Sequence, residues 1–164
     1  INCKLSLNIE NTTMLTIEKL KLKIDNNSRL LGLDIGSKRI GISICDDKRT
    51  IATPLKTLNF TNLNELIIKL KIIISENNIK ALIIGYPLNM DGSLGKSAQS
   101  INDKSKAIEK AIDVPVSLWD ERLSTVGAFN ISSQLDINVT KRTKNIDEKA
   151  ATFILQGAID YLNN

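Results

Sequence analysis

The chain of 164 residues contains no histidine, only two cysteines and few aromatic residues. Without histidine, Ser-His-Asp catalysis, Cys-His catalysis and histidine-ligated zinc are excluded. Cys3 and Cys45 are too few for a disulfide framework or a cysteine-based metal site, which is typical of a reducing cytoplasm. Any hydrolytic chemistry must therefore use carboxylates, lysines, hydroxyl groups or a metal ion that prefers oxygen ligands.

Long apolar runs and a strong excess of one charge are also absent. No apolar run is long enough to span a bilayer, and residues 1–28 lack the pattern of a secretory signal. We therefore expect a cytoplasmic protein with no membrane partner. The first residue is Ile1, and Met14 is a candidate start. The net charge of +4 favours an anionic partner only weakly.

The spacing of the apolar residues predicts an α/β fold with one mixed five-stranded sheet and helices on both faces. Residues 29–164 are expected to form a single domain, and residues 1–28 an extension that is helical around 14–24 and otherwise loose. Within the domain, an antiparallel three-stranded meander is followed by two further strands, predicted at 30–34, 40–45, 51–55, 81–85 and 114–119. Helices are predicted at 61–74, 97–112, 124–135 and about 147–162.

Acidic residues stand at the ends of these predicted elements. Asp34 ends the first strand, and Asp120 and Glu121 follow the fifth strand. Asp147 is expected to begin the last helix, which would bring it to the same edge of the sheet. Carboxylates that crowd together need a cation, and ligation by oxygen alone suits Mg²⁺ or Mn²⁺. Such an ion activates water and stabilises the transition state of phosphodiester hydrolysis.

Each acid also has a structural interpretation. Asp34 could cap an amide of the turn that follows it, and Asp147 could interact with the dipole of its helix. Asp120 and Glu121 point to opposite faces of an extended strand, so one of them could serve only to pair with Arg122. The spacing does not decide which of these two acids belongs to the site.

Four segments of the chain carry a family resemblance. In order, they are GLDIGSKRIGIS (32–43), ALIIGYPLNMDGSLG (81–95), DERLST (120–125) and DEKAATFILQ (147–156). They resemble the YqgF-type family of Holliday junction resolvases and pre-16S rRNA nucleases over about residues 30–162. The resemblance implies a ribonuclease H-like fold, a cytoplasmic location, and divalent-metal nuclease chemistry in ribosomal RNA maturation. By position, it also implies Asp34, Glu121 and Asp147 as the catalytic and metal-binding acids.

Basic and amide side chains near these acids are candidates for contacts with a phosphate backbone. Lys38 and Arg39 belong to the turn after Asp34, whereas residues 136–145 are expected to form a basic loop that clamps phosphates. Arg122 could equally form an ion pair with Asp120. The full candidate set is Lys38, Arg39, Asn89, Lys96, Arg122, Lys141, Arg142 and Lys144.

The leading functional hypothesis is a metal-dependent endonuclease that acts on structured nucleic acid. Its substrate would be precursor rRNA or branched DNA, and a branched DNA substrate would favour a homodimer. The alternative is a non-catalytic assembly factor that binds ribosomal RNA with the same fold. Transfer of phosphate from ATP is disfavoured because the Walker pattern needs glycine where Met90 stands.

Overall fold

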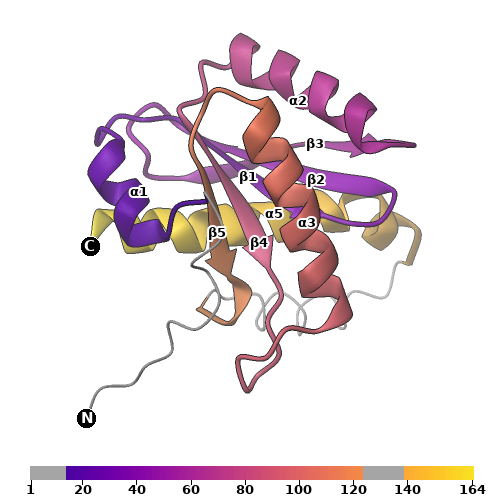
Figure 1. Ribbon diagram of the computed structural model, residues 1–164. Coiled ribbons are helices and arrows are strands. Elements are labelled where there is room, and N and C mark those ends of the chain that lie inside the picture. Colours follow the sequence, from indigo (N-terminus) through magenta and orange to yellow (C-terminus); the bar gives the residue numbers. More distant parts are fainter. Residues whose placement is uncertain (1–13, 124–138) are drawn as a thin grey trace.

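The protein is described here by a computed structural model that covers residues 14–123 and 139–164, with side chains for all of these except 139–145. Its centre is a five-stranded sheet with the strand order β3-β2-β1-β4-β5 (Figure 1). The first three strands form an antiparallel meander, and β4 and β5 run parallel to β1. The expected mixed sheet is thus confirmed, with strands β1 (Leu30–Ile35), β2 (Arg39–Cys45), β3 (Ala52–Asn59), β4 (Ala81–Tyr86) and β5 (Val116–Asp120).

Helices cover both faces of the sheet. Two of them lie on one face, while a long helix crosses the other face with a short helix beside it (Figure 1). On the first face lie α2 (Leu63–Glu76) and α3 (Lys96–Ala111), and on the second lie α1 (Ile17–Lys23) and α5 (Val139–Asn163). Asn62 caps α2, because its side chain accepts a hydrogen bond from the amide of Glu65 at 2.9 Å.

The alternation of side chains along β1 decides which residues face which helices. Leu31 and Leu33 pack with α2 and α3 in one core cluster. Leu30 packs with α1 and α5 in a second cluster on the opposite face. By the same two-residue period, Asp34 lies on the α5 face of the sheet. A carboxylate therefore stands where the strand would otherwise continue the second core cluster.

The strand β3 is longer than the sequence predicts. It extends to Asn59, and its pairing with β2 shifts register between Ile42 and Ser43. Pro54 is at this irregularity, on an edge strand, where a residue without an N–H group is tolerated. Beyond this irregularity, Lys56, Thr57 and Leu58 continue the pairing, so the proline does not end the strand.

The last helix also differs from the prediction. It begins at Val139, so Asp147 lies in its third turn and does not open it. Lys141, Arg142 and Lys144 consequently belong to the helix and not to a loop. No glycine or proline occurs between residues 139 and 156, so nothing in the sequence ends the helix there. The predicted helix at 124–135 lies outside the described residues.

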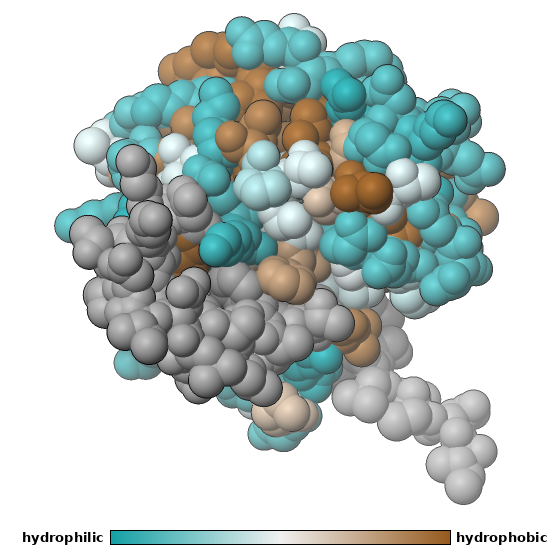
Figure 2. All heavy atoms as spheres, turned by 180° about the vertical axis from the view of Figure 1, so that it is seen from behind, coloured by the Kyte–Doolittle hydropathy of each residue, from teal (hydrophilic) through white to brown (hydrophobic). Residues whose placement is uncertain are grey.

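In the part of the face behind the sheet that Figure 2 draws in colour, hydrophilic side chains predominate and hydrophobic ones lie among them. Of the helices in the described part of the chain, none combines the length and the apolar character needed to cross a membrane.

Candidate functional site

Asp34 lies one residue before the end of β1, at the edge of the sheet where β4 and β5 also end. Both neighbouring strands present glycine beside it. Gly41 is its partner on β2, and the β1–β4 register, extended by one residue, brings Gly85 to its other side. Because glycine has no Cβ, other groups can approach Asp34 closely over both positions.

A different acidic residue occupies the space over each of these two glycines. A Cβ on Gly85 would lie 2.6 Å from Oε1 of Glu121, which follows β5 directly. A Cβ on Gly41 would overlap the backbone carbonyl of Asp147 in α5. The glycines thus let two acids, remote in sequence, approach Asp34 from opposite sides.

The electrostatics of the site reflect this proximity. Burial, and secondarily the charge of Asp147, raises the pKa of Asp34 from 3.8 to about 6. Burial also raises the pKa of Glu121, from 4.5 to about 7, and the charges of Asp34 and then Asp120 add to this effect. Asp34 is therefore electrostatically coupled to both other acids, and the ionised form of the pair Asp34 and Glu121 is disfavoured.

The carboxyl group of Asp34 also lacks hydrogen-bond support. No residue in the described ranges donates a hydrogen bond to it, including the amides of the turn that follows. The interpretation of Asp34 as a cap for this turn is therefore not supported. A largely buried carboxylate without donors is costly, and a bound cation would offset that cost.

Asp147 is oriented differently from the other two acids. Its Oδ2 forms an ion pair with Nε of Arg39 at 3.2 Å, beside the turn between β1 and β2. Its place in the third turn of α5 removes the helix-dipole interpretation, because that effect is confined to the first turn. Within residues 14–123 and 146–164, no three acidic or cysteine side chains form a group that could hold a metal ion.

The donors nevertheless suit a hard divalent cation. Mg²⁺ is commonly bound by one or two carboxylates together with water and substrate phosphates. Asp34 and Glu121 provide two carboxyl groups that are partly buried and electrostatically coupled. The chemistry of this pair fits Mg²⁺ or Mn²⁺, whereas a contribution of Asp147 requires its release from Arg39.

Arg122 distinguishes Asp120 from Glu121. Its guanidinium group contacts both carboxylate oxygens of Asp120, with the shortest distance 2.7 Å from Nη2 to Oδ2. Nη1 also donates to the backbone carbonyls of Asn89 and Met90 at 3.4 and 3.3 Å. Asp120 is thus occupied by Arg122, which also anchors the loop after β4, while Glu121 is directed towards Gly85.

The loop between β4 and α3 is held by its own polar side chains. Asp91 accepts hydrogen bonds from the amide and hydroxyl of Ser93, and Asn89 donates to the Ser93 hydroxyl at 3.0 Å. Gly92 has a φ of +84°, a conformation that favours glycine. The side chain of Asn89 therefore supports the loop, in addition to any contact with substrate.

A basic groove of about 330 Å³ lies beside the β1–β2 turn. Gly36 and Ser37 line one side, and Lys96 and Lys104 of α3 line the other. Lys104 donates to the carbonyl of Gly36 at 3.2 Å. Sequence reasoning missed Lys104, although its distance of two helical turns from Lys96 was a usable signal.

The remaining residues predicted to contact phosphate lie in two different places. Lys38 is exposed in the β1–β2 turn next to Arg39. Lys141, Arg142 and Lys144 lie in the first two turns of α5, where the structure describes the backbone alone. Sequence reasoning also missed Gly85, whose position opposite Asp34 becomes visible only through the strand pairing.

Known proteins resemble this chain in sequence and in fold. The model of the RuvX family, described as Holliday junction resolvase, matches residues 28–161. A protein of Pelagibacter ubique named "Putative pre-16S rRNA nuclease" is 67% identical over 151 residues, which is 92% of this chain and all of that protein. A protein of the same name from Cereibacter sphaeroides is 38% identical and covers 90% of this chain and 92% of its own length.

Among solved structures, RuvC of T. thermophilus in complex with a Holliday junction substrate matches with a TM-score of 0.54. It covers 82% of this chain and 94% of its own, at 10% sequence identity, so the likeness concerns the fold alone. The RuvC fold is ribonuclease H-like, as the resemblance in the sequence implies. From the family model and the curated relatives together, we conclude that this chain belongs to the RuvX family.

Proposed function

We propose that this protein is a nuclease that hydrolyses phosphodiester bonds in structured nucleic acid. The observation that carries the proposal is the largely buried carboxyl group of Asp34, which receives no hydrogen bond from a described residue and faces Glu121 across Gly85. Such an arrangement is unfavourable for folding alone, and perturbed carboxyl groups of this kind concentrate at functional sites. Membership of the RuvX family supports the same assignment.

Asp34 and Glu121 would hold a Mg²⁺ or Mn²⁺ ion, and Asp147 would join them when substrate phosphate competes for Arg39. When bound, the ion supplies a polarised water molecule and neutralises charge on the transferred phosphoryl group. The chain itself keeps the carboxyl groups close and partly shielded from water. The glycines at 41 and 85 make this approach sterically feasible.

The basic side chains around the acids would hold the sugar–phosphate backbone. The proposed cations are Lys38 and Arg39, where the β1–β2 turn meets β2, together with Lys96 and Lys104, which line the groove beside this turn. Arg122 would act indirectly, because its guanidinium is engaged by Asp120 and by the loop at 89–90. Lys141, Arg142 and Lys144, in the first turns of α5, remain proposed contacts.

The proposed substrate is precursor 16S rRNA, with a four-way DNA junction as the second candidate. The names of the curated relatives support the first, and the description of the family supports the second. The proposed location of the reaction is the cytoplasm. A homodimer, which a symmetric junction would favour, is tested by analytical ultracentrifugation with and without the junction.

One observation favours the alternative of a non-catalytic RNA-binding assembly factor. Asp147 is paired with Arg39, and the described residues contain no ready group of three metal-binding acids. An assembly factor would keep nucleic-acid affinity without any cleavage.

The two functions are separated by incubating the protein with labelled precursor rRNA and with four-way DNA, in Mg²⁺, Mn²⁺ or EDTA. We expect discrete products that require the metal and that disappear in Asp34→Asn, while binding of the nucleic acid is retained. Asp113→Asn, which removes an exposed acid in the turn before β5, is the matched control and should cleave normally. Binding without products in every metal would establish the assembly factor instead.

A further inference from the structure

A hollow lined by polar and charged residues lies at the end of the sheet opposite Asp34. It measures about 580 Å³ and is lined by residues just before β1 and β4 and in the β2–β3 turn, among them Arg29, Lys48 and Lys80. A second hollow of about 460 Å³ shares Asn27 and Lys80 with it and adds Lys23. We call the two together the Arg29 hollow. The proposed nuclease chemistry uses none of its residues.

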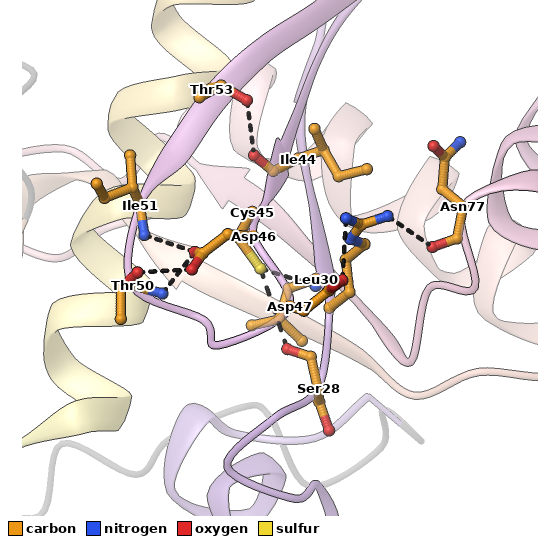
Figure 3. A network of polar contacts seen from close by, with 11 residues as sticks. Ser28, Leu30, Ile44, Cys45, Asp46, Asp47, Thr50, Ile51, Thr53 and Asn77 are labelled. Carbon is orange, nitrogen blue, oxygen red and sulfur yellow. Dashed lines mark hydrogen bonds and ion pairs between the residues drawn. The ribbon is translucent and has the colours of Figure 1, made fainter.

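Arg29 provides a cation that is fixed in place. Its Nη2 forms an ion pair with Asp47 at 3.0 Å, and its Nη1 donates to the carbonyl of Asn77 at 3.5 Å. Its Nε is buried and has no acceptor among the described residues. Figure 3 shows Asp47 beside Leu30, where β1 begins, and the hydrogen bond to the carbonyl of Asn77. The guanidinium is therefore oriented before any ligand arrives, and its hydrogen-bonding capacity is only partly used.

The lysines around Arg29 supply further positive charge. Lys48, Lys80 and Lys23 are exposed, and none forms an ion pair with another residue in the described ranges. Against these four cations the lining contains two carboxylates, Asp47 and Asp25, so the hollow carries a net positive charge of two. Amide side chains of Asn27 and Asn78 complete the lining of the larger hollow.

This combination of groups suits phosphate. A fixed guanidinium and mobile ammonium groups can share the oxygens of a phosphate, and amide N–H groups can add neutral donors. The net positive charge of the lining disfavours a cationic ligand. An open, solvent-facing hollow of this kind matches a phosphate on a chain better than an enclosed small molecule.

We propose that the Arg29 hollow binds phosphate groups of a nucleic-acid backbone at a distance from the bond that is cleaved. The proposal rests on the proposed nuclease function for the identity of the ligand. Asp34 lies five residues after Arg29 along the strand, which separates the two by roughly 17 Å at about 3.3 Å per residue. A substrate that reaches both sites must therefore extend over several nucleotides or present a second helical arm.

The test compares RNAs of two lengths in binding experiments. Fluorescence anisotropy is measured for a long stem-loop RNA and for a short RNA that cannot reach both ends of the sheet. The double variant Lys48→Ala, Lys80→Ala should bind the long RNA about tenfold more weakly, with a salt dependence reduced by about two released counterions. Its affinity for the short RNA, and its cleavage of a short substrate, should stay unchanged.

The control variant Lys56→Ala, Lys71→Ala removes the same charge from exposed positions on β3 and α2, and it should bind both RNAs nearly as the wild type does. Equal loss in both double variants would overturn the proposal, because the effect would then be that of net charge. So would unchanged affinity of Lys48→Ala, Lys80→Ala for the long RNA. Absence of cleavage with intact length-dependent binding would reject the nuclease function but leave the hollow assigned.

A final comparison identifies the source of the phosphate. Inorganic phosphate and a nucleoside monophosphate are titrated into isotope-labelled protein, and amide shifts around residues 29, 48 and 80 are followed by NMR. Weak, millimolar binding of both small anions supports a backbone site that gains its affinity from a longer chain. Two results together would overturn the backbone proposal and assign the hollow to a small ligand. They are tight binding of either small anion to the wild type, and unchanged affinity of Lys48→Ala, Lys80→Ala for the long RNA.

Discussion

The carboxyl group of Asp34 combines three unfavourable features in one residue: burial, the proximity of Asp147 and Glu121, and the lack of a described hydrogen-bond donor. A residue selected only for stability would be an apolar one at this position, because the α5 face of β1 otherwise belongs to the core. This electrostatic cost indicates that the carboxyl group is there to bind a ligand. The cost can be measured directly as a change in the free energy of unfolding.

We predict that Asp34→Asn stabilises the protein at pH 8 by about 1–2 kcal/mol. The pKa of Asp34 is about 6 in the folded protein and has the ordinary value of 3.8 when unfolded, so the folded state binds more protons between these values. Stability of the wild type therefore falls as the pH rises through this window, and asparagine avoids the loss. The measurement is urea unfolding at pH 4 and pH 8, in the presence of EDTA.

The difference between Asp34→Asn and the wild type should be much smaller at pH 4, where the folded aspartate is protonated and its cost in the folded state is largely removed. Asp113→Asn, an exposed control, should show no such pH-dependent gain. Equal stability of Asp34→Asn and the wild type at pH 8 would mean that Asp34 carries no electrostatic cost.

Between elements, glycines decide how closely α5 approaches the sheet. At Gly32, a Cβ would collide with the side chains of Ser43 and Leu155, and at Gly41 with the backbone of Asp147. The hydroxyl of Ser43 donates to the carbonyl of Ala151 at 2.7 Å, which fixes the helix over the same strands. The position of Asp147 beside Asp34 is therefore a property of the contact between α5 and β2.

We predict that Gly41→Ala destabilises the protein by about 1–3 kcal/mol and moves Asp147 away from Asp34. The obstacle is the helix backbone, which cannot rotate out of the way as a side chain can. Urea unfolding measures the loss, and the pKa of Asp34, followed by NMR, should fall as the like charge recedes. The nuclease activity should fall with it.

Gly95→Ala is the matched control at the N-cap of α3. A Cβ there meets Asn89 at an ordinary distance of 3.5 Å and the φ of −80° suits alanine, so the loss should be much smaller. Equal stability of Gly41→Ala and Gly95→Ala would show that α5 adjusts freely over β2.

On the scale of the whole molecule, the acidic site and the Arg29 hollow lie at opposite ends of the sheet. Asp34, Glu121 and Asp147 gather at the end where β1, β4 and β5 terminate. The cations of the Arg29 hollow gather at the end where β1 and β4 begin. The parallel pairing of β1 and β4 produces this division, because it collects like ends of strands at the same edge.

We predict that Mn²⁺ or Mg²⁺ raises the melting temperature of the wild type. At a free metal concentration of ten times its dissociation constant, the expected gain in stability is about 1.4 kcal/mol. The double variant Asp34→Asn, Glu121→Gln should show no increase, and Na⁺ at matched ionic strength should stabilise neither protein. Differential scanning calorimetry at pH 8 provides the measurement, and an equal response of both proteins would place the metal elsewhere.

Much of this protein follows from local patterns in its sequence. The alternation in the strands, the helical stripe after Asn62 and the position of Asp34 at a strand end all depend on residues a few positions apart. Such patterns follow the periodicity of the helix or strand backbone, so they can be interpreted without knowledge of the tertiary structure. The lack of histidine further restricted the chemistry to carboxylates and other oxygen donors. The family resemblance indicated Glu121 over Asp120.

Other features depended on contacts between residues far apart in the chain. Only the tertiary structure placed Gly41 and Gly85 on either side of Asp34, engaged Asp120 with Arg122, and turned Asp147 towards Arg39. It also gathered Arg29, Lys48 and Lys80, which no sequence pattern connects, into one hollow. The physical reason is that register and helix packing are set by the joint burial of many side chains. Spacing along the chain does not encode the resulting distances.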